Sequence, residues 1–112
     1  MATPSNADLN RLYAASLEFG ANWRRPVLEL AALHLGHLSG DEQAAISSRV
    51  SQCRQEIEAR IEATHVTVNG SWNAELDDAL EQWICERFPW MNPDNRRHAI
   101  SQGRYYAWRE HG

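Results

Sequence analysis

The chain has 112 residues, of which 43% are hydrophobic, and a formal net charge of −4. A chain of this length buries roughly two-thirds of the surface that its unfolded form exposes, so we expect one domain over residues 1–112 that needs no metal or disulfide to hold its core. All 11 basic residues are arginine, which excludes Schiff bases, P-loop lysines and lysine general bases, and which is typical of a GC-rich bacterial genome.

The first predicted helix starts at Ser5 or Asn6, either of which suits an N-cap. It ends at Gly20, because glycine readily adopts the left-handed conformation that closes helices. Its apolar residues share one side of a helical wheel and are Leu9, Leu12, Tyr13, Leu17 and Phe19. An apolar side of this width indicates that the helix packs against a partner helix.

The second predicted helix begins at Pro26, because proline is tolerated in the first turn of a helix. Its sequence, PVLELAALHLGHLS, is apolar almost all round, which predicts the central and most buried helix. His34 and His37 are followed closely by Asp41, and two histidines with one carboxylate could bind a metal ion. Gly40 interrupts the helical register before Asp41, so we expect structural histidines, with no metal and no other cofactor.

Ser39 and Glu42 have the Ser-x-x-Glu spacing of a capping box, which predicts the start of a third helix. Apolar residues then recur every three or four positions, at Ile46, Val50, Cys53, Ile57, Ile61 and Thr64. If this helix continued to Asn69-Gly70 it would be roughly 42 Å long, whereas a compact domain of this size is roughly 34 Å across. We therefore expect it to bend or end near residues 64–68, or to project and meet a second subunit.

The fourth predicted helix starts at Ser71 or Asn73, after the turn that Asn69-Gly70 makes, and Pro89 ends it. Its apolar residues form a broad arc on the wheel and are Trp72, Leu76, Ala79, Leu80, Trp83, Ile84 and Phe88. We expect Trp83, near the middle of this arc, to lie in the core.

A fifth helix is indicated by Asn92 as its cap and Pro93 at its first position. Every strong apolar pattern in the chain thus has the helical period. The predicted fold class is all-α: a compact bundle of four to five helices, with one long central helix for which a bend near residues 64–68 is one of the alternatives.

No pattern of residues identifies a reaction. The sequence holds no G-x-S-x-G, H-E-x-x-H, Walker A or dinucleotide-binding motif. Cys53 and Cys85 match no zinc or redox spacing, so we expect two reduced thiols. The acidic residues of the fourth helix that lie away from its apolar arc are most simply a solvated face, and general acids need burial. We therefore expect no enzyme.

The last 25 residues, FPWMNPDNRRHAISQGRYYAWREHG, combine arginines with large aromatic rings. On a helical wheel the inward arc is formed by Ala99, Ile100, Gly103, Tyr106 and Ala107, and Gly103 permits a neighbouring helix to approach closely. The flank of the same helix carries Arg97, Ser101, Arg104 and Trp108, in which Arg104 over Trp108 would form a cation–π pair.

Charge is unevenly distributed, with −1 over residues 1–56, −5 over residues 57–88 and +2 over residues 89–112. The basic end could contact phosphates while Tyr105 or Trp108 stacks on a base, as in proteins that bind single strands. It could equally pair with the acidic segment inside the fold. Because the overall charge of −4 repels nucleic acid, we expect the arginines to serve the fold or a protein partner.

The function expected from the sequence is a small helical protein-binding module: a regulator, inhibitor, immunity factor or adaptor. Its partner contacts would be Trp90, Arg97, Arg104, Tyr105 and Trp108, the residue types that interfaces favour. A homodimer is left open, and the alternative is a nucleic-acid-associated factor that uses Arg96, Arg97, Arg104 and Trp108. No apolar run is long enough to span a bilayer and no leader pattern opens the chain, so we expect a cytoplasmic protein without a membrane partner.

Overall fold

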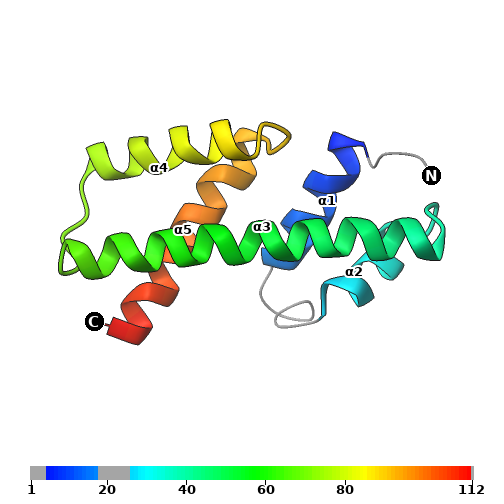
Figure 1. Ribbon diagram of the computed structural model, residues 1–112, viewed down its shortest axis with the longest axis horizontal. Helices are drawn as coiled ribbons and strands as arrows, with labels where there is room; N and C mark the ends of the chain where they lie inside the picture. Colours follow the sequence, from blue (N-terminus) through cyan, green and yellow to red (C-terminus); the bar gives the residue numbers. More distant parts are fainter. Residues whose placement is uncertain (1–4, 18–25, 112) are drawn as a thin grey trace. The chain divides into compact units, whose positions relative to one another are not determined.

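The computed structural model describes residues 5–17 and 26–111, and within these ranges the chain forms five helices and no strand (Figure 1). The helices are α1 (Asn6–Leu17), α2 (Val27–His34), α3 (Gly40–Thr67), α4 (Ala74–Arg87) and α5 (Pro93–His111). The predicted all-α fold is confirmed. Among the helices described, none has the length and apolar character needed to cross a membrane. The predictions for Phe19 and Gly20 lie outside the described residues.

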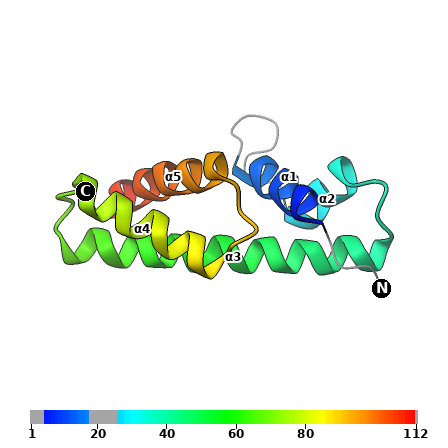
Figure 2. The same ribbon diagram turned by 90° about the horizontal axis from the view of Figure 1, so that it is seen from above.

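The chain divides into two compact units, Met1–Cys53 and Arg54–Gly112, and α3 contributes its first half to one and its second half to the other. Figure 2 shows α1 and α2 beside the first half of α3, and α4 and α5 beside the second half. The expectation of one domain over residues 1–112 stays a prediction.

The helices begin where the capping residues predict. At the start of α3, the Ser39 hydroxyl accepts a hydrogen bond from the Glu42 N–H at 3.2 Å, and the Glu42 carboxylate accepts one from the Ser39 N–H at 2.9 Å. The bond from the Ser39 backbone, followed by that from its side chain, holds the pKa of Glu42 below its usual value. Asn73 and Asn92 cap α4 and α5 in the same way, through hydrogen bonds of 2.9 and 2.8 Å from the backbone three residues later.

The third helix ends within the range where a bend or an end was expected, but its 28 residues still span about 42 Å. α3 stops at Thr67, and Asn69 and Gly70 then take positive φ angles of 53° and 74°. The Gly70 N–H donates to the carbonyl of His65 at 3.0 Å, so the last turn closes on itself. His65, 3% exposed, completes the buried stripe of α3 in place of the expected Thr64.

The core of the unit Met1–Cys53 is built from one stripe of each of its helices. The buried apolar residues are Leu9, Leu12, Tyr13, Ala15, Leu17, Leu30, Ala31, Leu35, Ile46, Val50 and Cys53. α1 packs directly on α2, as the width of its apolar side predicted.

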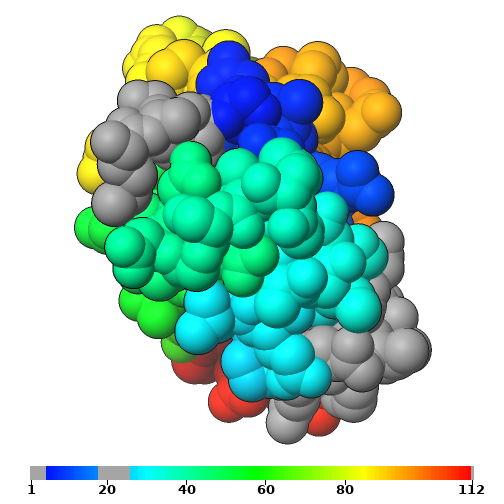
Figure 3. Space-filling model, turned by 90° about the vertical axis from the view of Figure 1, so that its right-hand side faces the viewer, coloured from blue at the N-terminus to red at the C-terminus, as the bar shows by residue number. Residues whose placement is uncertain are grey.

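The second helix is not the most buried one, which corrects the expectation from its composition. α2 has only eight residues and turns Leu30 and Ala31 inward, while Leu28 and Leu33 are 53% and 61% exposed. Figure 3 shows α2, in cyan, at the surface. The neighbours of α2 in this unit cover only one stripe of its surface. The remaining apolar side chains stay exposed, so the apolar composition of the helix overestimated its burial.

In the unit Arg54–Gly112, the core lies between the second half of α3, α4 and α5. Its buried apolar residues are Ile57, Ile61, Leu80, Ile84, Phe88, Trp90, Met91, Ala99, Ile100 and Ala107. Trp83, expected in the core, is only partly buried at the edge of this arc, where the Arg60 guanidinium lies 4.9 Å from its ring. An aromatic ring under a guanidinium can keep one face near water at little cost.

Gly103 sets the approach of α5 to α3, as its place on the inward arc predicted. A Cβ atom added at Gly103 would lie 2.5 Å from Ile61 Cδ1, and Ile61 is fully buried. Since carbon atoms in contact are normally about 3.5 to 4 Å apart, the site has no room for a methyl group unless Ile61 moves.

The two faces of α2 can be distinguished by matched charge substitutions. Leu30→Asp buries an unpaired carboxylate and should unfold the Met1–Cys53 unit, because the cost of several kcal/mol approaches the total stability of a small domain. Leu33→Asp, on the exposed face of the same helix, should leave the thermal transition nearly unchanged. Equal melting temperatures for the two variants, measured by circular dichroism, would contradict this assignment of the core.

The contact at Gly103 predicts a strong dependence of one substitution on another. Gly103→Ala should lower the free energy of unfolding by about 1 kcal/mol, because overpacking outweighs the gain in helix propensity. Ile61→Val removes the Cδ1 atom that the new methyl would meet, so Gly103→Ala should be neutral or stabilising in that background. A chemical-denaturation cycle measures this coupling, and additive effects would show that the close contact does not limit stability.

Candidate functional site

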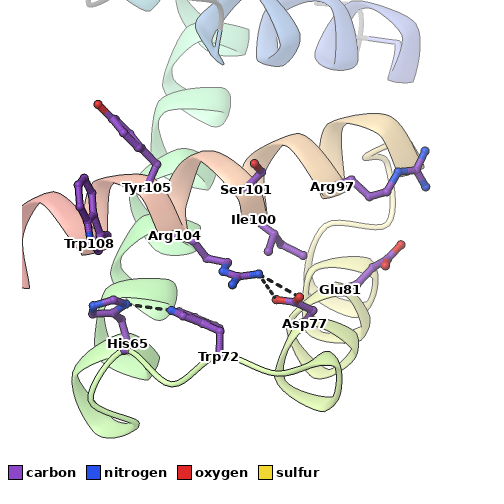
Figure 4. Close-up of a pocket in the computed structure, with 11 residues that line it drawn as sticks. His65, Trp72, Asp77, Glu81, Arg97, Ile100, Ser101, Arg104, Tyr105 and Trp108 are labelled. Carbon is purple, nitrogen blue, oxygen red and sulfur yellow. Dashed lines mark hydrogen bonds and ion pairs between the residues drawn. The ribbon is translucent and has the colours of Figure 1, made fainter. Parts of the chain in front are cut away.

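A pocket of about 710 Å³ opens in the unit Arg54–Gly112 between the end of α3, the α3–α4 connection, α4 and α5 (Figure 4). It is lined by His65, Gly70, Trp72, Asp77, Glu81, Arg97, Ile100, Ser101, Arg104, Tyr105 and Trp108. Four of the five predicted contact residues, Arg97, Arg104, Tyr105 and Trp108, are therefore brought together here. The pocket is in the size range of ligand-binding cavities.

One wall is fixed by a hydrogen bond between two aromatic side chains. The Trp72 indole N–H donates to His65 Nδ1 at 2.9 Å. Because an indole nitrogen can only donate, His65 Nδ1 must be unprotonated, and the neutral ring carries its proton on Nε2. Nε2 is buried, and no other described residue accepts from it. His65 thus orients the Trp72 ring through this hydrogen bond.

Arg104 is held between two elements at the centre of the pocket. Its Nη1 donates to both carboxylate oxygens of Asp77, at 3.1 and 3.0 Å, and its Cζ lies 4.9 Å from the centre of the Trp72 ring. The cation–π pair expected with Trp108 is therefore formed with Trp72 instead. The bond to Asp77 holds the guanidinium away from its own helix, near the start of α4. There it also lies close to Trp72 of the α3–α4 connection (Figure 4).

Tyr105 and Trp108 stand at the pocket with much of their surface in solvent. They are 46% and 60% exposed, and their ring centres lie 6.3 Å apart at an angle of 35°. Of the large hydrophobic side chains that the structure describes as exposed, only these two are aromatic. Exposed rings of this size beside a pocket are typical of a surface that a partner covers.

The charged residues of the pocket are largely paired. Arg96 Nε lies 3.6 Å from Glu81, so with Arg104 and Asp77 two ion pairs join α5 to α4. The basic end and the acidic segment thus pair inside the fold, one of the two alternatives that the charge pattern left open. Arg97 instead pairs with Asp94 on its own helix, and its side chain is 62% exposed.

Trp90 does not belong to this surface. Its side chain is 9% exposed and packs edge-on against Phe88, with ring centres 6.4 Å apart. The turn from Phe88 to Met91 is closed by a backbone hydrogen bond of 3.0 Å, and the Trp90 indole lies in the core, so little of it is available for the expected partner contact. A tryptophan between two prolines looked like a loop residue in the sequence.

The two histidines predicted on the second helix have different surroundings, and only His34 lies within α2. His37 Nε2 lies 3.1 Å from Asp8, whereas His34 Nε2 is buried. In residues 5–17 and 26–111, no three His, Cys, Asp or Glu side chains form a group that could hold a metal ion. Cys53 and Cys85 are reduced thiols, the first buried and the second exposed.

Sequence reasoning missed the half of the pocket that α5 does not supply. His65, Trp72, Asp77 and Glu81 come from three other segments, and no periodicity within one helix connects them to Arg104. The sequence did hold one sign of this contact, because residues 57–88 and 89–112 carry opposite charge. That pattern indicated that the two segments meet, but it did not identify which residues pair. The resulting arrangement of aromatic walls around a fixed guanidinium is suited to binding.

The two arginines should differ in their effect on stability. Arg104→Ala should lower the free energy of unfolding by about 1 to 2 kcal/mol, since it removes a half-exposed ion pair and a cation–π contact and leaves Asp77 without its cation. Arg97→Ala should change it by less than about 0.5 kcal/mol, because its ion pair is exposed. Equal losses in thermal or urea unfolding would mean that Arg104 does not anchor the pocket.

The comparisons with known proteins add no function to this geometry. No family matches the chain, and neither a curated protein nor a solved structure is similar to it. Any proposal about function therefore rests on the geometry and chemistry of the pocket.

Proposed function

We propose that this chain is a protein-binding module without catalytic activity, which acts as a regulator, inhibitor, immunity factor or adaptor. Its recognition surface would be the pocket together with Tyr105 and Trp108. The observation that carries this proposal is the exposure of these two rings, 46% and 60%, beside the pocket. Inside the pocket, hydrogen bonds already hold Trp72 and Arg104 in place.

The energetics of association favour such a surface. Tryptophan, tyrosine and arginine contribute most to binding energy at protein interfaces, and α5 alone lines this pocket with four such residues, Arg97, Arg104, Tyr105 and Trp108. Covering Tyr105 and Trp108 removes apolar area from water, while Trp72 and Arg104 are already ordered and lose little entropy on binding. A partner would gain most by packing an apolar side chain against these two rings.

The charges of the pocket favour a protein over nucleic acid. Arg97 and Arg104 are balanced in the lining by Asp77 and Glu81, so the lining has no formal net charge. Binding to a polyanion rests on neutralising several phosphates with unpaired cations. The alternative function would use Arg96, Arg97, Arg104 and Trp108, but Arg96 and Arg104 are each paired with a carboxylate of α4.

Differential capture tests the proposal. The parent chain, Tyr105→Ala/Trp108→Ala and Leu28→Ala/Leu33→Ala would be used to purify partners from the native host. The Leu28/Leu33 variant is the matched control, because it also removes two exposed apolar side chains but from the other unit. We expect a protein that the parent and the control retain and the aromatic variant loses, with at least about tenfold weaker affinity in titration of the purified pair.

Other outcomes decide between the alternatives. Identical partners and affinities for both double variants would overturn the proposal. Oligonucleotide binding by the parent that falls steeply with salt and is lost in Arg97→Ala would favour the nucleic-acid-associated factor. If the retained protein were a second copy of this chain, sedimentation would show a dimer that dissociates in the aromatic variant.

A further inference from the structure

The guanidinium of Arg104 has one occupied edge and one edge that is open. Asp77 takes both of its bonds from Nη1, while Nε and Nη2 donate to none of the residues that the structure describes. The side chain lines the pocket and is 37% exposed. The Nε and Nη2 edge of a guanidinium presents two parallel N–H groups, which match the two oxygens of a carboxylate.

This open edge is held in place before any ligand arrives. Asp77 fixes Arg104 on one side, the Trp72 ring lies against its face, and His65 fixes Trp72 in turn. A flexible arginine would lose rotamer freedom on binding, whereas one that is already clamped loses little. Preorganisation of this kind is typical of a recognition residue rather than of a chance surface ion pair.

The neighbours of Arg104 on α5 add a polar side and an apolar side. Ser101 and Arg97 precede it on α5 and also line the pocket, and Figure 4 shows the Arg97 guanidinium pointing away from Arg104. Trp108 follows about one turn later, roughly 6 Å along the helix axis, and Tyr105 lies beside it. A ligand that contacts both Arg104 and the two rings needs a hydrogen-bond acceptor and a large apolar group. The distance between these two groups is about that from the backbone of one residue to the end of its side chain.

The charge of the lining limits the acceptor to a single negative charge. Arg104 and Arg97 are already partly neutralised by Asp77 and Asp94, and Glu81 also faces the pocket. A dianionic phosphate would meet these carboxylates at close range, whereas a carboxylate needs only the open edge of Arg104. The C-terminus of a polypeptide carries such a carboxylate on the same residue as a side chain.

We infer that the pocket binds the C-terminal carboxylate of a partner polypeptide whose last residue is aromatic or large and aliphatic. The carboxylate lies on the Nε and Nη2 edge of Arg104, and the last side chain packs against the exposed surfaces of Trp108 and Tyr105. This inference rests on the proposed function and specifies which part of the partner is recognised.

The inference can be tested with a matched pair of probes, N-acetyl-L-phenylalanine and its C-terminal amide, which differ only in the charged group. Binding would be followed through the indole N–H signals of the intact chain in nuclear magnetic resonance titrations. We expect the acid to bind at least about tenfold more tightly than the amide, with the largest shifts at Trp72 and Trp108. N-acetyl-L-alanine, which lacks the apolar group, should bind more weakly than the phenylalanine acid.

Two variants and one longer probe complete the design. Arg104→Lys keeps the charge but loses the paired N–H groups of the guanidinium, and should remove the preference for the acid. Arg87→Lys, the same exchange at an exposed arginine that does not line the pocket, should retain it. The fold of each variant is checked from its spectrum. A hexapeptide ending in phenylalanine should bind more tightly than N-acetyl-L-phenylalanine, because residues before the terminus add contacts.

Each failure has a distinct meaning. Equal binding of acid and amide would overturn the carboxylate assignment while leaving protein binding through the aromatic rings intact. No binding of any probe would also overturn it, whatever the capture experiment finds. Tighter binding of inorganic phosphate than of the acid, or a hexapeptide no tighter than the single residue, would assign the pocket to a small anionic molecule and reject a polypeptide terminus.

Discussion

The unit Arg54–Gly112 depends on the contact of one guanidinium with two other side chains. Arg104 of α5 is bonded to Asp77 of α4 and stacked on Trp72 of the α3–α4 connection, and Trp72 is bonded to His65 near the end of α3. These four side chains, which we call the polar chain, connect all three helices of the unit. Because a guanidinium bonds in its plane and stacks on its face, a single residue can fix two directions at once.

The polar chain is placed by backbone features that lie outside the pocket. Gly103 lets α5 approach Ile61 of α3, which brings the neighbouring Arg104 close to the connection. The turn at Asn69 and Gly70 ends α3 and returns the chain toward Trp72. Tight packing on one side of α5 therefore accompanies the open pocket on its other side, since Gly103 faces Ile61 and Arg104 lines the pocket.

Most of the fold could be predicted because it is encoded locally. The capping box of Ser39 and Glu42 and the asparagine caps of α4 and α5 act over three residues, and the structure contains each of them. The burial of α2 and Trp90 was predicted wrongly, since exposure depends on how much of a helix its neighbours cover and on where a turn directs a ring. These are properties of contacts between segments, which periodicity does not contain.

The candidate site shows the same division between local and non-local information. The α5 stripe was visible in the sequence, because Arg97, Arg104 and Trp108 repeat at helical spacing. The partners of Arg104 were not visible in the sequence, because Asp77 and Trp72 lie far from it in the chain. Each of them also fitted the pattern of the predicted fourth helix without any contact to another segment. Trp108 was predicted as the stacking partner of Arg104 because the two residues are one turn apart on the same helix. The ion pair with Asp77 of α4 places the guanidinium on Trp72 instead.

The net charge of the chain is a poor guide to what the pocket attracts. The acidic segment and the basic end neutralise each other through Arg96 with Glu81 and Arg104 with Asp77, so the charges that dominated the sequence pattern are mostly used within the unit. What remains for a ligand is directional: an open guanidinium edge beside two exposed rings. Specificity at such a site depends on the geometry of one charged group next to one apolar group, and long-range attraction contributes little because neighbouring charges of opposite sign cancel at distances beyond the Debye length.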